Sequence, residues 1–152
     1  MTVQIAVIGS GSDDKEIKSL AQEVGREIAK YGGVLVCGGL GGAMEAVAMG
    51  AKEMGGVTLG IIPGDDSKNA NKYIDYVVVT GMGHARNVLV VKSADAVIAL
   101  PGGMGTLSEI ALALKMGKHV IGVGSSWEKI EGVKTIKSPK EAVKYIFDSG
   151  IL

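Results

Sequence analysis

The chain has 152 residues, with 16 basic and 16 acidic side chains and no formal net charge at neutral pH. This charge balance argues against a chain that binds nucleic acid or anionic membranes through a basic surface. Hydrophobic residues make up 47% of the chain, which suits a single domain over residues 1–152. A single cysteine excludes an internal disulfide and a cysteine-rich metal site. We therefore expect a cytoplasmic protein with no bound metal, no membrane span and no nucleic-acid partner.

Short apolar runs alternate with segments of helical periodicity along the whole chain. The predicted strands are residues 3–8, 34–37, 57–62, 76–79, 96–100 and 119–123, with 133–136 as a seventh candidate. The predicted helices are residues 13–30, 83–93 and 139–149. Two more follow the second and fifth strands and carry Met44, Val47, Ala48 and Ala51, and Leu107, Ile110, Ala111 and Leu114. Asp13 and Glu16 have the spacing of a capping box at the start of the first helix. This alternation predicts an α/β, Rossmann-like, three-layer α/β/α fold with a mostly parallel, doubly wound sheet of six or seven strands.

Two glycine-rich turns share the pattern Gly-Gly-x-Gly, and each lies between a predicted strand and a predicted helix. Glycine lets backbone N–H groups approach a ligand, and a helix start adds unpaired donors and partial positive charge. Such turns are suited to phosphate, although tight strand–helix turns also favour glycine for purely structural reasons. The predicted phosphate ligands are Gly38, Gly39, Gly41, Gly42, Gly102, Gly103, Met104, Gly105 and Thr106.

A third turn follows the first strand and contains Gly9 and Ser10, which we include in the predicted site. It begins like a dinucleotide-binding Gly-x-Gly-x-x-Gly motif but lacks the third glycine. The second strand ends in Cys37, where such proteins carry an acidic ribose ligand, so an NAD-dependent dehydrogenase is not expected. A turn before a capped helix explains Gly9 and Ser10 equally well. The Walker phosphate-binding pattern is also absent from the sequence.

Two charged residues are candidates for chemistry at the carboxyl edge of the sheet. Glu109 follows the second glycine turn and could reach a bound ribose, but Thr106 to Glu109 also has capping-box spacing. Arg86 begins the helix after the fourth strand, where a guanidinium could bind phosphate or a sugar diol. The alternative interpretation of Arg86 is a solvated arginine on the surface.

The remaining chemistry-bearing residues favour structural interpretations. Cys37 ends a buried strand and is expected to be a small core residue. His84 lies in a glycine-rich turn, where the simpler interpretation is a polar turn residue with no functional role. Trp127 lies in a predicted loop and could border an interface or a ligand. The polar segment 63–72 is a candidate loop near the site.

Residues 101–109, Pro-Gly-Gly-Met-Gly-Thr-Leu-Ser-Glu, resemble the PGGxGTxxE motif of the Lonely Guy family of cytokinin-activating phosphoribohydrolases. Many members carry an older description as possible lysine decarboxylases, an activity that we do not expect here. The resemblance covers about residues 3–123 and implies that Arg86 and Glu109 are catalytic. The implied reaction splits a nucleoside 5′-monophosphate into its base and ribose 5-phosphate.

Two departures from the hydrolase pattern are visible. Glu45 stands where the hydrolases have a glycine, and Asn87 follows Arg86 where they have a lysine. These features look more like the branch that includes molybdenum cofactor carrier proteins, which implies binding of a phosphorylated pterin or nucleotide without turnover. No cofactor is required on this interpretation, and molybdopterin is a possible carried ligand. We also expect a homodimer or homotetramer.

Overall fold

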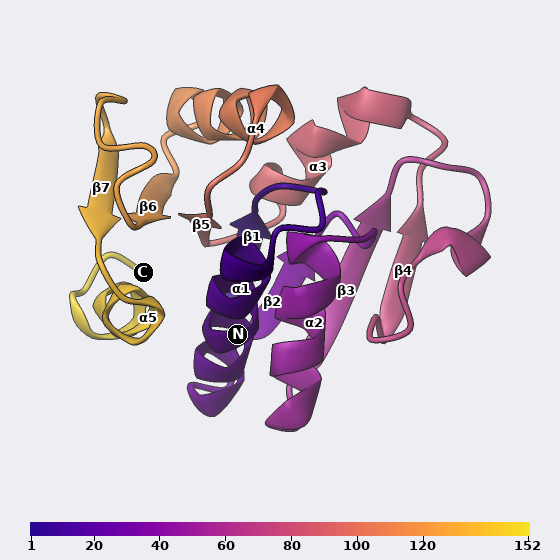
Figure 1. Ribbon diagram of the computed structural model, residues 1–152, viewed down its shortest axis with the longest axis horizontal. Helices are drawn as coiled ribbons and strands as arrows, with labels where there is room; N and C mark the ends of the chain where they lie inside the picture. The colour runs from indigo at the N-terminus through magenta and orange to yellow at the C-terminus, as the bar shows by residue number, and fades with distance from the viewer.

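The computed structural model describes residues 1–152 and contains one seven-stranded parallel sheet between two layers of helices (Figure 1). The strands are β1 (Gln4–Ile8), β2 (Val34–Cys37), β3 (Val57–Ile62), β4 (Tyr76–Val79), β5 (Ala96–Ala99), β6 (His119–Val123) and β7 (Val133–Ile136). The helices are α1 (Lys15–Lys30), α2 (Ala43–Glu53), α3 (Asn87–Lys92), α4 (Met104–Lys115) and α5 (Pro139–Asp148), with 3-10 helices η1 (Ser67–Asn69) and η2 (Gly83–Arg86). This architecture confirms the predicted three-layer, doubly wound α/β fold.

The strand order β4-β3-β2-β1-β5-β6-β7 places the first strand of the chain inside the sheet. The chain moves outward from β1 to β4, returns to β5 beside β1, and then continues to β7. Ile8 pairs in register with Ala99, so β1 and β5 end at the same level. The loops that follow these two strands leave in opposite directions, and this reversal opens a crevice at the carboxyl edge of the sheet.

Each face of the sheet has its own apolar core. Helices α1, α2 and α5 cover the face with the larger core, which has 20 buried residues, and α3 and α4 cover the other face with 13 (Figure 1). Helices α1 and α2 touch backbone to backbone, because a Cβ at Gly25 would collide with the carbonyl of Val47 and one at Gly50 with that of Gln22. Glycine in the middle of a helix normally lowers its stability, but here the two glycines allow the helices to pack this closely.

The first helix begins later than its sequence pattern predicts. Its N-cap is Asp14, whose side chain accepts a hydrogen bond from the N–H of Ile17 at 3.1 Å. Asp13 instead forms an ion pair with Lys18. The predicted capping box of Asp13 and Glu16 is therefore wrong, because the residue one position later takes the extended backbone conformation that a cap requires.

One corner of the sheet lacks a helical cover. Helix α3 has only six residues, and the face that it shares with α4 carries the in-register pairs Leu59–Tyr76 and Ile61–Val78 of β3 and β4. Tyr76 is 65% exposed and Val78 is 43% exposed. This leaves apolar side chains uncovered at the β4 edge. No helix of the chain combines the length and the apolar character needed to cross a bilayer.

Candidate functional site

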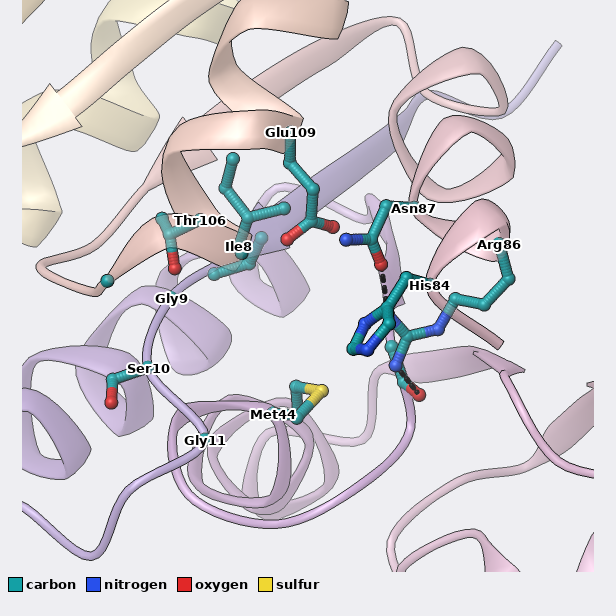
Figure 2. A pocket seen from close by; sticks show the side chains of 14 residues that line it. Ile8, Gly9, Ser10, Gly11, Met44, His84, Arg86, Asn87, Thr106 and Glu109 are labelled. Atoms are coloured by element: carbon teal, nitrogen blue, oxygen red, sulfur yellow. Dashed lines mark hydrogen bonds between the residues drawn. The ribbon is translucent and has the colours of Figure 1, made fainter. Parts of the chain in front are cut away.

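A cavity of about 350 Å³ lies at the carboxyl edge of the sheet, where the strand order reverses between β1 and β5 (Figure 2). Five parts of the chain form its wall: the end of β1 with the turn after it, the turn after β2, the start of α2, the η2–α3 junction and the start of α4. The lining residues are Val7, Ile8, Gly9, Ser10, Gly11, Gly38, Met44, His84, Arg86, Asn87, Gly103, Gly105, Thr106 and Glu109.

The second glycine turn opens directly into this cavity. Gly103 is the N-cap of α4, and no side chain caps the helix, so its first backbone N–H groups have no intrahelical acceptor. A Cβ built on Gly103 or Gly105 would meet no atom within 4 Å. Gly102 differs, because a Cβ there would collide with the hydroxyl group of Thr106. The start of α4 therefore presents open backbone donors, with partial positive charge, to the cavity.

The first glycine turn is largely closed by the protein itself. A Cβ at Gly38 would lie 2.6 Å from both Nη2 of Arg86 and Sδ of Met44. Gly42 has a φ of 63° and packs against the backbone of Gly11. The N–H of Ala43, at the start of α2, donates to the carbonyl of Ser10 at 2.9 Å. The two turns share a sequence pattern, but only the second has open glycines, Gly103 and Gly105, in the wall of the cavity.

The structure therefore divides the predicted binding residues into two groups. Those in the cavity wall are Gly9, Ser10, Gly38, Gly103, Gly105 and Thr106, and those outside it are Gly39, Gly41, Gly42, Gly102 and Met104. Gly39 is buried against Ile62, whereas Met104 is 82% exposed. Both predicted catalytic residues, Arg86 and Glu109, lie in the wall.

Arg86 is buried, with 8% of its surface exposed, and is held by three hydrogen bonds. Its Nε donates to the carbonyl of Ile61 at 2.8 Å, Nη2 donates to the carbonyl of Gly38 at 3.2 Å, and Nη1 donates to Oδ1 of Asn87. The guanidinium thus joins the ends of β2 and β3. Burial lowers the pKa of Arg86, while the Glu109 carboxyl opposes that change. An arginine remains a cation under these conditions, so the cavity wall contains a fixed positive charge.

Glu109 lies one turn and a half into α4 and faces the cavity (Figure 2). It does not cap the helix, because the N-cap is Gly103 and Thr106 lies within the helix. Its carboxyl group forms none of the chain's five ion pairs. Burial raises the pKa of Glu109 to about 7, although the Arg86 cation acts in the opposite direction. Near neutral pH this group can therefore donate or accept a proton.

Sequence reasoning left five lining side chains out of the site, two of them Val7 and Ile8 of β1. His84 and Asn87 flank Arg86 in the chain, and Met44 begins the turn of α2 beside Gly38. For Asn87 the available signal was its position next to Arg86, where the hydrolase pattern has lysine. For Met44 there was none, because a methionine near a helix start is equally suited to packing.

Other candidate residues lie away from the cavity. Glu45 lines a separate groove on the outer surface of α1 and α2, so it does not face the open start of α4. The thiol of Cys37 is buried, which raises its pKa to about 11 and leaves it unreactive. Trp127 is also buried, and its Nε1 donates to the carbonyl of Leu100 at 2.9 Å, so it is part of the core and lies outside the cavity wall. In segment 63–72, the side chain of Asn71 donates to the carbonyl of Leu40 at 2.9 Å, outside the cavity wall.

Comparisons with known proteins cover almost the whole chain. The sequence profile of the SLOG cluster4 family matches residues 2–148. The molybdenum cofactor binding protein of Rippkaea orientalis superimposes with a TM-score of 0.93 and 38% identity, over 100% of this chain and 99% of that one. The molybdenum cofactor carrier protein of Chlamydomonas reinhardtii superimposes with a TM-score of 0.85 and 31% identity, over 97% of each chain.

A cytokinin riboside 5′-monophosphate phosphoribohydrolase of Mycobacterium tuberculosis is 42% identical over 98 residues. That match covers 62% of this chain and 52% of the enzyme. The chain therefore spans about half the length of the phosphoribohydrolases that it matches.

Proposed function

Because the chain belongs to the SLOG cluster4 family, within the Lonely Guy superfamily that its motif indicated, we propose that it binds a phosphorylated pterin or nucleotide as a carrier. Similarity over the full length of two molybdenum cofactor binding proteins supports this function. Phosphorylated pterins and nucleotides share a phosphate group and a planar, hydrogen-bonding heterocycle. In this proposal molybdopterin is the carried ligand rather than a resident cofactor.

The open start of α4 is the observation that carries the proposal. Gly103 and Gly105 leave space for a phosphate beside the unpaired N–H groups of the first turn. Thr106 lies in the same wall, and its hydroxyl group could donate to a phosphate oxygen. The Arg86 cation adds long-range attraction for an anion in a partly buried site. Since only one of the two helix starts opens into the cavity, the cavity suits a ligand with a single phosphate group.

Hydrolysis of a nucleoside 5′-monophosphate is the second candidate function. It is supported by the placement of Arg86 and Glu109 in one cavity and by the partial match to phosphoribohydrolases. In such a reaction Arg86 would orient the ribose phosphate. A Glu109 carboxyl with a pKa of about 7 could assist departure of the base or activate water.

One set of measurements separates these functions. The purified protein is incubated with AMP, GMP and CMP, and released base is measured by chromatography. In parallel, pterin bound to protein purified from molybdopterin-producing cells is measured by fluorescence after oxidation. Retained pterin without base release supports the carrier, whereas base release that E109Q abolishes supports the hydrolase. Neither result, together with no thermal stabilisation by any of these nucleotides or by ribose 5-phosphate, would refute both functions.

The proposal includes a homo-oligomer in a reducing, cytoplasmic setting. The uncovered apolar residues Tyr76 and Val78 at the β4 edge support association with another copy. The chain has a single cysteine, Cys37, which is buried and has no partner for an internal disulfide, and this supports a reducing compartment. Analytical ultracentrifugation of the chain and of a Y76K variant tests the first point: we expect the variant to have the smaller sedimentation coefficient.

A further inference from the structure

Arg86 and Glu109 are oppositely charged and buried in the wall of one cavity, yet they do not form an ion pair. Arg86 and Glu109 have 8% exposure each, and neither belongs to any of the five ion pairs of the chain. Opposite charges attract strongly where water is largely excluded. Their separation therefore requires a structural cause.

The hydrogen bonds of the guanidinium show how it is held. Each of its three nitrogens donates to an acceptor of the protein: Nε to Ile61, Nη2 to Gly38 and Nη1 to the side-chain oxygen of Asn87. The first two acceptors are backbone carbonyls, which no side-chain substitution removes. Asn87 supplies the only side-chain acceptor, and it is itself 8% exposed.

The other end of the Asn87 side chain faces the acid. In Figure 2 its amide nitrogen points toward the Glu109 carboxyl, while its oxygen points toward Arg86. We propose that Asn87 is a positioning residue, which holds the Arg86 guanidinium against the strand ends and separates it from the Glu109 carboxyl, so that both groups stay available to a ligand. This role deepens the proposed function and rests on it, since it supposes that a ligand uses the two groups.

The surroundings of Glu109 agree with this arrangement. The charged or titratable groups near it are Arg86, the Cys37 thiol and, in the same wall, His84. Burial keeps the Cys37 thiol neutral, and Arg86 is the cation whose charge acts on the Glu109 carboxyl. A direct ion pair would hold the pKa of Glu109 low, but it is raised to about 7. Burial is the main cause of that rise, and the Arg86 cation offsets it only in part, as expected when an amide keeps the two groups from pairing.

Two substitutions of Asn87 test the proposal because they act on Glu109 in opposite directions. N87A frees Nη1 of Arg86 to pair with Glu109, so we expect the acid dissociation constant of Glu109 to rise at least tenfold. N87D keeps an acceptor for Arg86 but places a second carboxylate against Glu109, so we expect that constant to fall about tenfold. The measurement is a pH titration of the Glu109 carboxyl carbon by NMR, with E109Q to assign the signal.

The signs of the two shifts decide the outcome. An unchanged Glu109 titration in N87A, or shifts of the same sign in both variants, would overturn the proposal, because a purely structural role gives no reason for opposite signs. If N87A does not fold, N87D alone decides: a titration in which the acid dissociation constant of Glu109 does not fall overturns the proposal equally. Since this measurement needs no ligand, its result does not depend on whether the protein carries a pterin or hydrolyses a nucleotide.

A binding measurement extends the test to the ligand. Ribose 5-phosphate serves as the probe, with calorimetry as the readout. We expect N87A to bind it about tenfold more weakly, because the new ion pair occupies Arg86. Removing the pairing partner in N87A/E109Q should restore most of that affinity. If the double variant binds as weakly as N87A, the ion pair is not the cause.

Discussion

Replacing Gly105 with alanine should stabilise the free protein and weaken its ligand binding. Gly105 is the second residue of α4, and a Cβ there meets no atom within 4 Å and no strained backbone angle. Alanine in a helix is more stable than glycine by about 0.5–1 kcal/mol, because the unfolded chain loses less entropy on folding. For a domain of this size that gain raises the melting temperature by about 1–4 °C.

The same methyl group would occupy the space in which we propose that a phosphate approaches the start of α4. A ligand at 100 times its dissociation constant stabilises a protein by about 2.7 kcal/mol. If the methyl group weakens binding tenfold, the same ligand concentration stabilises G105A by about 1.4 kcal/mol. Thermal melts of both proteins, with and without ribose 5-phosphate, measure the two effects separately.

Gly41 offers a matched control. It belongs to the first glycine turn, a Cβ there also meets no atom within 4 Å, and it lies outside the cavity wall. G41A should keep the full stabilisation by ribose 5-phosphate. If G105A binds this probe as tightly as the unaltered chain, or if G41A loses binding equally, phosphate does not bind at the start of α4.

Two further predictions concern the buried charges. Burial raises the pKa of Glu109 from 4.5 to about 7, so the folded state binds its proton more tightly, and the unfolding free energy should fall by about 3 kcal/mol as pH rises through this range. Urea denaturation at about pH 4 and about pH 8 measures this change, and the unfolding free energy of E109Q should decrease less than that of the unaltered chain. Equal decreases in the two proteins would contradict a buried, protonated Glu109 in the folded state. The unfolding free energy of R86K should be lower by about 1–3 kcal/mol. A lysine ammonium group cannot donate hydrogen bonds to the acceptors of Ile61, Gly38 and Asn87 together, because they lie in three different directions. Unchanged stability of R86K in urea would show that these three bonds contribute little.

The order of strands and helices follows from local patterns that are visible in the sequence. Apolar runs such as 34–37 and 96–100 can bury the side chains of both strand faces only in a sheet that is covered on both sides. Glycines mark the turns between strands and helices. The position of Glu109 four residues after the glycine turn of residues 102–105 also limited it to the carboxyl edge of the sheet. These features depend on near neighbours in the chain, so periodicity and turn chemistry were enough to predict them.

The difference between the two glycine turns could not be predicted in this way. They have the same local pattern, but Arg86, from 48 residues further along the chain, fills the space beside Gly38, while no side chain approaches Gly105. The raised pKa of Glu109 and the placement of Asn87 beside it likewise depend on contacts between distant segments. Which donors stay free, and which charges stay unpaired, is set by how β2, β3, α3 and α4 pack together, because burial and hydrogen bonding are properties of that packing and not of any single segment.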